Sequence, residues 1–510
     1  MIKKFKYIIF LILVFLVTFI SGCGKNENQS EIKSLDDLSG KKVAIIVGTI
    51  HDKLISERVP DAQIEYYNNL ADGIAALKSG SVDAYVQPGS SALFLMFENP
   101  GLKTLDEHLL DGNIAFIFPK TDKGKALNAE FSEFVVSMRQ QGELDKLREK
   151  WFAEGEAGKN MPKIPKNGKN GVLKLATSAT QVPYTYIRDN ENVGLEIELA
   201  VLFANQYDYG LDIIDMNFDG LIPYIKTDLA DMACSCFAIT EERKESVDFA
   251  ESHIQDSVVV MVMDSDYSQK SNIFSSIIEK IDKTFIREKR YKMFIDGVVV
   301  TLSINLLSIF FGTLIGFFVF FLCRKSGKKT NKIIQICIWL IQGTPVVVLL
   351  MILYYIVFAK LGTNPFIVSV IGFTLIFSCA VFNMLSMGFN AVDIGQTEAA
   401  YALGYSDSKT VFRILLPQAA QHFIPAFKTQ VTALLKATSV VGFIAVTDLT
   451  RAGDLVRSRT YEPFFSLISV AIIYFMLEAL CNLILNNIEK KINPENRSDK
   501  KVLKGVKTDD

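Results

Sequence analysis

The chain has 510 residues, of which 49% are hydrophobic, and its mean hydropathy of +0.25 is high for a soluble protein. That length is enough for about three domains. The four histidines are widely scattered, which argues against a histidine-based metal site, and the seven spaced cysteines contain no CxxC pair, which argues against a disulfide framework.

Residues 1–23 have the pattern of an export signal. Three early lysines precede an apolar run over residues 7–20, which is short for a spanning helix and ends in small residues. The segment resembles a bacterial lipoprotein signal, which implies that Cys23 is lipidated after cleavage. The alternative is an uncleaved signal anchor. In either case we expect residues 24–35 to form a polar tether and the chain after it to be exported.

Two α/β segments follow, separated by a linker. Residues 36–152 alternate short strands and helices and end on a helix predicted over 127–152. Residues 153–171 are rich in Gly, Pro and Lys, as linkers are. Residues 172–264 begin a second α/β set, with an apolar strand predicted over 258–263.

These segments resemble the soluble receptor of polar amino-acid ABC importers, a two-lobed clamp of the periplasmic-binding-protein class. The similar stretches are Thr240 to Arg243, Val247 to Phe249, and the Lys150-Trp151-Phe152 helix end. In the usual receptor, segments like 172–264 come first and build most of lobe 1, and segments like 36–152 then supply lobe 2. We therefore expect a circularly permuted receptor whose linker joins the former chain ends. Two truncated receptors in tandem are the alternative.

A small zwitterion needs a positive fork for its carboxylate, which an arginine supplies bidentately, and backbone N–H groups at a helix start add donors. Thr240 can cap the short helix that carries Arg243, and the resemblance implies that both bind the ligand carboxylate. Phe218 falls where the family has a stacking aromatic side chain, and Ser178 falls where it often has Asp. Further predicted ligand-binding residues are Tyr184, Thr49 and Gln87.

One position departs from the receptor pattern. The family has an Asp shortly after the strand that contains Val82-Asp83-Ala84, and this Asp takes the ligand α-amino group. Here Pro88 occupies that place, so neutral hydrogen bonds from Gln87 or Ser90 are the available substitutes. The departure leaves the identity of the solute open.

The second half of the chain is predicted to be an all-α membrane domain, residues 296–487. An amphipathic connector over 265–295 leads into it and a charged tail, 488–510, follows it. Five apolar runs are each long enough to cross about 30 Å of hydrocarbon. They cover residues 296–323, 335–360, 365–389, 422–447 and 463–486. Lys428 and Lys436 lie within these runs, and such residues either border a solute path or pair between helices.

Between the third and fourth runs stands Glu398-Ala399-Ala400, followed at fixed spacing by Gly404, Ile414 and Leu416-Pro417. Small side chains let another protein approach the backbone, Gly404 permits a turn between two short helices, and Pro417 fits the start of a helix. The stretch resembles the EAA loop of ABC-importer permeases, which docks into a cleft of the ATPase. With the chain starting outside, five crossings place this loop inside, as the basic loop 324–332 also favours.

The whole chain resembles a receptor fused to a histidine/glutamine-type permease subunit of an ABC importer. The resemblance implies import of amino acids or similar small polar solutes across the bacterial plasma membrane, with the receptor on the outer side. No GxxxxGK motif followed by Ser or Thr occurs, so ATP and Mg belong on a partner ATPase dimer and this chain needs no cofactor. We expect a homodimer through the permease domain, no nucleic-acid partner and no enzyme activity. A ligand-gated channel or a solute sensor on the same clamp is the alternative.

Overall fold

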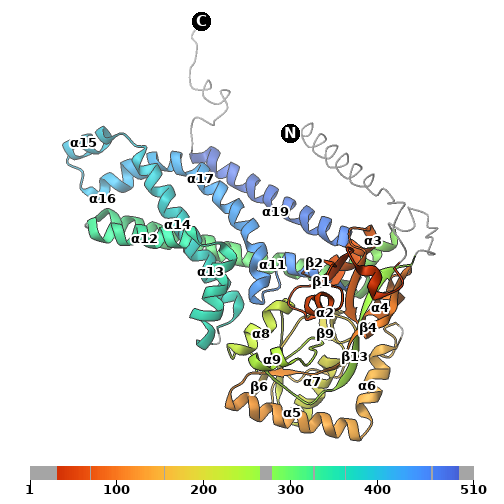
Figure 1. Ribbon diagram of the computed structural model, residues 1–510. Coiled ribbons are helices and arrows are strands. Elements are labelled where there is room, and N and C mark those ends of the chain that lie inside the picture. The colour runs from red at the N-terminus through yellow and green to blue at the C-terminus, as the bar shows by residue number, and fades with distance from the viewer. Residues whose placement is uncertain are drawn as a thin grey trace.

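The structure is a computed structural model that describes residues 32–264 and 278–492, apart from residues 69, 154, 326–327, 362 and 461–462. The predicted signal with Cys23, part of the connector, and the end of the charged tail lie outside the described residues. Figure 1 shows the two remaining parts: an α/β receptor domain at one end of the molecule and a bundle of long helices leading away from it.

The receptor domain contains a first lobe, lobe A, built on a five-stranded sheet in the order β2-β1-β3-β13-β4. The chain's first strand is buried along most of its length because it lies between two parallel neighbours and under helices on both faces. The strands are β1 (Lys42–Ile46), β2 (Gln63–Tyr67), β3 (Ala84–Pro88), β4 (Leu102–Ile114) and β13 (Ile254–Met263). The helices are α2 (His51–Arg58), α3 (Leu70–Ser79) and α4 (Gly89–Glu98), after a short 3₁₀ turn, η1 (Leu35–Leu38).

The second lobe, lobe B, is built on a sheet in the order β10-β6-β11-β5-β12, with a small sheet β7-β8-β9 beside it. Its strands are β5 (Ile117–Phe118), β6 (Val172–Thr177), β7 (Thr180–Gln181), β8 (Thr185–Arg188), β9 (Glu191–Val193), β10 (Gly210–Asp215), β11 (Met232–Cys234) and β12 (Asp248–Phe249). Its helices are α5 (Asp122–Gln140), α6 (Glu143–Phe152), α7 (Leu195–Gln206), α8 (Phe218–Lys226) and α9 (Glu241–Ser246). Trp151 is fully buried in its core and donates from Nε1 to Glu198 at 2.6 Å.

The two sequence segments interleave in both sheets. β5 comes from the first segment but pairs with β11 and β12 of the second, whereas β13 comes from the second segment and pairs with β3 and β4. Neither segment can therefore complete a sheet alone, and they form one interlocked two-lobed domain. The expected division of the lobes at the linker is wrong, because the chain passes between lobes near residues 114–117 and 249–254 instead.

The helix predicted over residues 127–152 is also two helices. α5 ends at Gln140 and α6 begins at Glu143. Gly142 between them has φ +69°, a conformation that breaks an α-helix and that glycine adopts at low cost.

The helical half begins with two irregular turns, η2 (Asp282–Ile286) and η3 (Arg287–Lys289). The longer helices are α11 (Tyr291–Lys325), α12 (Lys328–Gly343), α13 (Val346–Ile352), α14 (Pro365–Asn390), α17 (Leu416–Ala437), α18 (Leu449–Thr460) and α19 (Pro463–Ile492). The connecting pieces are η4 (Leu353–Val357), η5 (Ala359–Leu361), α15 (Ile394–Ala402), α16 (Asp407–Thr410), η6 (Val411–Leu415) and η7 (Thr438–Ile444).

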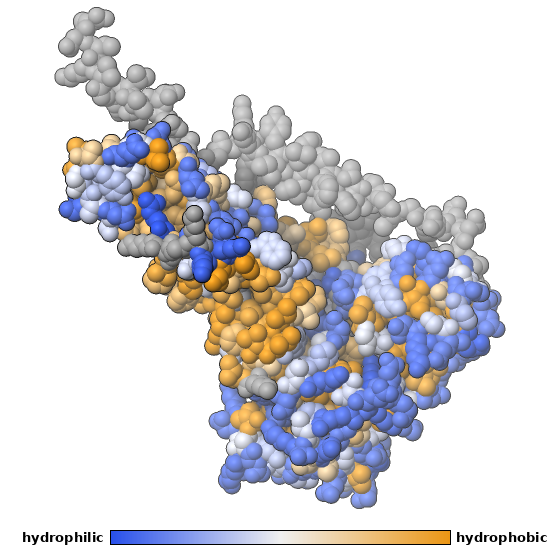
Figure 2. Space-filling model, turned by 60° about the vertical axis from the view of Figure 1, so that its left-hand side comes forward, coloured by the Kyte–Doolittle hydropathy of each residue, from blue (hydrophilic) through white to orange (hydrophobic). Residues whose placement is uncertain are grey.

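Among the described residues, three helices are long and apolar enough to cross a membrane, and the count rises to five if each of two bent helix pairs is one span. One bent pair joins α12 to α13 with a 108° break next to Pro345, because proline cannot continue the helical hydrogen-bond ladder. Figure 2 shows hydrophobic side chains gathered over this half and a mostly hydrophilic receptor surface. The structure therefore combines a two-lobed α/β clamp with an all-α membrane domain, as predicted.

In the helical half, α11 and α14 pack closely where α11 has glycine residues. A Cβ on Gly312 would lie 2.9 Å from the Phe377 Cβ, and a Cβ on Gly316 would lie 2.6 Å from the Ser378 carbonyl oxygen. The GxxxG spacing thus lets α11 approach α14 closely, which is its usual role in membrane helices.

Candidate functional site

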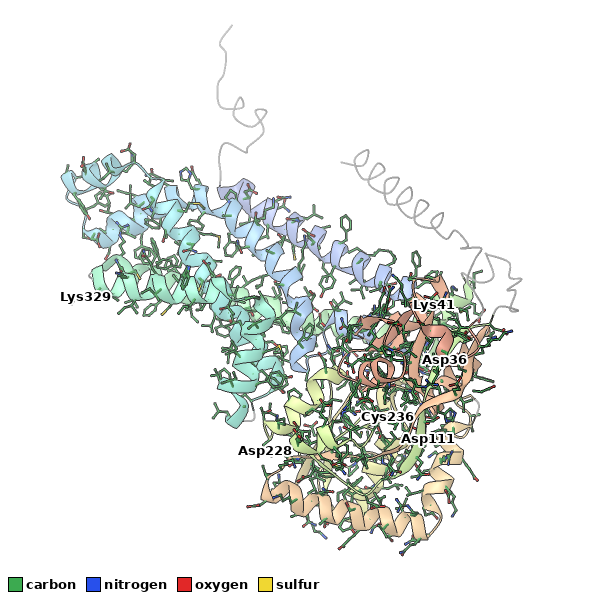
Figure 3. All side chains as sticks on the ribbon, viewed as in Figure 1. Asp36, Lys41, Asp111, Asp228, Cys236 and Lys329 are labelled. Atoms are coloured by element: carbon green, nitrogen blue, oxygen red, sulfur yellow. The ribbon has the colours of Figure 1, made fainter. Side chains whose placement is uncertain are left out.

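A small cavity of about 40 Å³ lies between the two lobes of the receptor domain. Lobe A lines it with residues that follow β1 and with residues on β3, β4 and β13, and lobe B lines it from β7, α8, α9 and the loop after β11. Cys236, one of the lining residues, is labelled inside the receptor domain in Figure 3. Burial raises the pKa of its thiol, so this group stays protonated at neutral pH. The volume holds a few water molecules, so a larger ligand requires the lobes to separate.

Arg243 supplies the positive charge of this cavity. One guanidinium nitrogen donates across the lobes to the Gly48 carbonyl at 3.1 Å, and the other donates to the Ala238 carbonyl at 3.3 Å. The rings of Phe237 and Phe218 lie 5.4 and 5.9 Å from the guanidinium carbon. Burial lowers the pKa of Arg243 to about 10, so the side chain remains charged at neutral pH. Among the described residues no carboxylate forms an ion pair with it, so the site holds a buried cation that an anionic ligand group would neutralise.

Two neutral groups in the same cavity also lack partners. His51 and Gln181 are each only 5% exposed, and neither the His51 Nδ1 atom nor the Gln181 Oε1 atom has a hydrogen-bond partner in the described structure. Burial, with a smaller effect from the Arg243 charge, lowers the pKa of His51 to about 3. A buried polar atom without a partner costs free energy, so both atoms are available to a polar ligand.

We expect His51 to make the protein less stable in mild acid. The folded state keeps His51 neutral down to a pH of about 3, while the unfolded chain takes up the proton near the ordinary pKa of 6.5. Between these values the unfolded state binds more protons, so the free energy of unfolding falls by about 1.4 kcal/mol for each unit that the pH drops. The measurement is the melting temperature of the full chain from pH 7 to 4. A His51→Gln variant should show a shallower slope, and an identical slope in both proteins would contradict this role.

A triangle of oxygens joins the lobes at the edge of the cavity. Tyr184 from lobe B places its hydroxyl 2.7 Å from the Asp256 carboxylate and 2.7 Å from the Ser90 Oγ, and Ser90 Oγ also donates to Asp256. Asp256 further accepts from the backbone N–H groups of Ser90 and Ser257. The three oxygens form three mutual contacts, but the two hydroxyls supply only two protons. One contact thus lacks a proton, and oxygen lone pairs of the triangle stay available to a further donor.

Removing the hydroxyl of Tyr184 should weaken the hold between the lobes. A Tyr184→Phe substitution keeps the ring packed but deletes a bond to a carboxylate, which is worth about 1.5–3 kcal/mol. We expect a lower melting temperature of the full chain, with a smaller change for Tyr67→Phe, whose hydroxyl bonds the partly exposed Glu65 inside lobe A. An equal change in the two variants would show that the contact between lobes has no special weight.

Only some of the predicted ligand-binding residues line the cavity. Thr49, Phe218 and Arg243 line the cavity, whereas Thr240 stands outside it and caps α9 by accepting from the Arg243 N–H at 3.3 Å. The other three predicted residues are Tyr184, bonded to Asp256 as described above; Gln87, whose buried amide has no partner among the described residues; and Ser178, whose Oγ lies 3.2 Å from Thr180 Oγ1. Their roles stay predictions.

The sequence did not indicate the other residues of the cavity, among them the polar side chains of His51, Gln181 and Asp256. Asp256 lies on β13, two residues before Val258, which pairs with Pro88 on β3. An acid on the neighbouring strand thus lies close to the position of Pro88. No local sequence pattern indicates that pairing, because β3 and β13 are separated by more than 160 residues in the chain.

The EAA-like stretch forms two short helices at the end of the bundle far from the receptor (Figure 1). α15 and α16 are joined by a turn in which Gly404 has φ +77°, and Pro417 lies in the first turn of α17. Glu398 and Ala399 are exposed and Ala400 is buried, while Ile414 and Leu416 are half-buried. Exposed apolar side chains accompany them, among which Leu403 is 77% exposed. Figure 3 labels Lys329, which lies at the start of α12 within the predicted basic loop, on the same side of the molecule.

The two intramembrane lysines both pair with α19. Lys436 Nζ lies 2.9 Å from a Glu478 oxygen, and Lys428 bonds Asn486 and lies 3.6 Å from Glu489. These contacts fit the interhelical-pairing interpretation of the two lysines. Their role in a solute path stays a prediction.

The membrane half matches known proteins. Residues 308–494 match the family described as "Binding-protein-dependent transport system inner membrane component". The putative glutamine transport system permease protein GlnP of Rickettsia felis is 30% identical over 203 residues, which are 39% of this chain and 92% of that protein. The L-cystine transport system permease protein TcyL of Bacillus subtilis is 31% identical over 201 residues, 38% of this chain and 84% of that protein.

Among solved structures, "an amino acid ABC transporter with histidines" is 28% identical, with a TM-score of 0.38, over 44% of this chain and all of that chain. The sequence relatives are permeases, so the chain is a transport subunit and not an enzyme. Its apolar helices make it a multi-pass protein of the plasma membrane. The chain belongs to the family of binding-protein-dependent transport system inner membrane components, as the permease component of an amino-acid ABC transporter.

Proposed function

We propose that this chain is both the solute receptor and the membrane-spanning subunit of an ATP-driven importer for amino acids or similar small polar solutes. The observation that carries the proposal is the fusion itself: one chain holds a permease of an amino-acid transporter and a two-lobed clamp with a buried Arg243 between its lobes that has no carboxylate partner among the described residues. The relatives named for glutamine and L-cystine make amino acids the first solutes to test.

The cavity chemistry fits a zwitterion. Arg243 offers a guanidinium without a carboxylate partner among the described residues, which suits a ligand carboxylate. The triangle formed by Asp256, Ser90 and Tyr184 holds a carboxylate and two hydroxyl oxygens, whose remaining lone pairs can accept from a ligand ammonium group. Arg243 borders the cavity from lobe B and Asp256 borders it from lobe A. A bound amino acid that contacts both would therefore hold the lobes together.

The EAA loop is proposed to couple the permease to a separate ATPase. Its two short helices expose Leu403 and neighbouring apolar side chains to solvent, and such a patch marks a docking surface. The receptor lies at the opposite end of the bundle, which supports a topology with the receptor outside and the loop inside. A bundle with one set of spans has exposed apolar helix faces, and we propose that a second copy covers part of them.

The test is uptake by the full chain in proteoliposomes, together with an amino-acid-importer ATPase from the same host. L-glutamine, L-arginine and L-cystine are the probes. We expect uptake of at least one probe that depends on ATP inside the compartment holding the ATPase. Uptake that needs no ATP would favour the ligand-gated channel, and binding without uptake would favour the sensor. Labelling of Cys23 by a radioactive lipid precursor in the host would test the predicted lipid anchor.

A further inference from the structure

One helix of the permease half holds the receptor domain at three places. α18 (Leu449–Thr460) packs its apolar face against the β7–β8 sheet and α11, in a cluster that includes Ala179, Met293 and Leu455. Three arginines of α18 then each bind an acid from a different part of the receptor domain. Because α18 carries three arginines and Asp454, we take α17 as the apolar part of their bent pair and α18 as a platform beneath the receptor.

The first arginine binds lobe B. Arg451 holds both oxygens of Asp215, at 2.8 and 2.9 Å, and also donates to Asn217 at 2.7 Å. The side chains of Arg451 and Asp215 are 5% and 8% exposed, so water screens this pair little. Asp215 ends β10, and its position is therefore rigidly tied to the sheet of lobe B.

The second arginine binds lobe A. Arg457 donates to Asp72 at 2.7 Å and to Asp454 of its own helix at 2.6 Å. Asp72 lies in the first turn of α3, whose buried face packs on the sheet of lobe A. Without Arg457, the carboxylates of Asp72 and Asp454 would face each other without the cation between them.

The third arginine binds the linker between the two receptor segments. Arg459 donates to Glu156 at 2.7 Å and to Glu288, which precedes α11, at 3.1 Å. Glu156 also accepts from Arg188 of lobe B at 2.8 Å, and these cations keep the pKa of Glu156 below its usual value although burial opposes them. The linker is thus a third attachment and not a loose connection.

We propose that α18 detects closure of the receptor: it holds the two lobes at their closed separation, and opening of the receptor breaks one of its ion pairs. Arg451 and Arg457 are six residues apart on one helix, a rise of about 9 Å that cannot stretch. Asp215 and Asp72 belong to different lobes, so both pairs can form only at one separation of the lobes. By linkage, whatever closes the lobes strengthens docking on α18, and docking favours closure equally.

α18 is also connected through a single long helix, α17, to the opposite end of the bundle. It follows α17 through η7 with a 55° bend, and α17 starts at Leu416 of the EAA-like stretch. A shift of α18 would therefore move a helix that ends at the proposed ATPase-binding loop. Only this last step rests on the proposed function; the contacts with the lobes do not.

The experiment measures the separation of the lobes in the full chain, purified in lipid nanodiscs without any added ligand. Spin labels on genetically encoded residues replace exposed Asp61 in lobe A and exposed Lys125 in lobe B. Double electron–electron resonance then gives their distance distribution. We expect Arg457→Ala to shift the distribution to longer distances, and Arg457→Glu combined with Asp72→Arg to bring it back toward that of the unsubstituted chain.

The matched control is Arg58→Ala, which removes an arginine whose ion pairs with Asp36 and Glu107 stay inside lobe A, and it should leave the distribution unchanged. Unchanged distances in both Arg457→Ala and Arg451→Ala would overturn the proposal, as would an equal shift in the control. The charge-reversed pair keeps the test decisive if a single substitution lowers stability. Because no transport is measured, failure of uptake would count against the proposed function and not against this inference.

Discussion

Replacing Arg243 by Ala should abolish specific binding of the amino-acid probe that the full chain recognises. The guanidinium is buried, charged and without a carboxylate partner among the described residues, so a ligand carboxylate would gain a desolvated charge pair. Truncating one side of such a pair costs about 2–5 kcal/mol, which is roughly a 30- to 4000-fold loss of affinity. Equilibrium binding of L-glutamine, L-arginine and L-cystine to the detergent-purified chain measures it.

Two further variants test whether the loss of binding is specific to the guanidinium group of Arg243. Arg243→Lys keeps the charge but not the planar fork, so its affinity should fall between those of the unsubstituted chain and Arg243→Ala. Arg139→Ala removes a half-exposed arginine paired with Glu251 and should bind normally. If a probe binds Arg243→Ala with unchanged affinity, the cavity between the lobes is not the binding site.

Replacing Gly404 by Val should uncouple the transporter while leaving the receptor intact. Gly404 has φ +77°, and a Cβ added to it would have nothing within 4 Å, so the obstacle to a side chain there is backbone conformation and not space. The left-handed conformation costs an L-residue about 1–2 kcal/mol, and a β-branched side chain suits it least. The loop should then abandon the turn that presents α15 and α16 together. We expect at least a tenfold fall in probe-stimulated ATP hydrolysis by the partner ATPase, because about 1.4 kcal/mol lost from docking already corresponds to a factor of ten.

Probe binding and melting temperature show whether Gly404→Val changes the receptor or the fold, and ATP hydrolysis shows whether it changes coupling to the ATPase. Probe binding and the melting temperature of the receptor half should not change in Gly404→Val, because the loop lies at the opposite end of the bundle. Gly343→Ala, a glycine with equally open surroundings but no positive φ, is the matched control. Normal ATP hydrolysis in Gly404→Val would mean that the turn does not set the docking geometry.

Much of the membrane half could be predicted because its signals are local. A run of apolar residues suffices to indicate a span, a Gly312–Gly316 spacing suffices to indicate close helix packing, and Pro345 suffices to indicate a break. The EAA-like turn also follows from neighbours in the chain, since Gly404 alone permits its positive φ. In the receptor, Thr240 as the cap of α9 was equally local.

The amino-acid sequence by itself thus determined the class of the protein and the apolar runs of its membrane half, and it predicted Arg243 as a ligand-binding residue. Only the tertiary structure decided which strands share a sheet, that Asp256 borders the cavity beside Pro88, and that α18 binds both lobes. The physical reason is distance along the chain. Arg451 and Asp215 are 236 residues apart, and such pairs form through sheet pairing and domain docking, which leave no periodic or neighbouring pattern in the sequence.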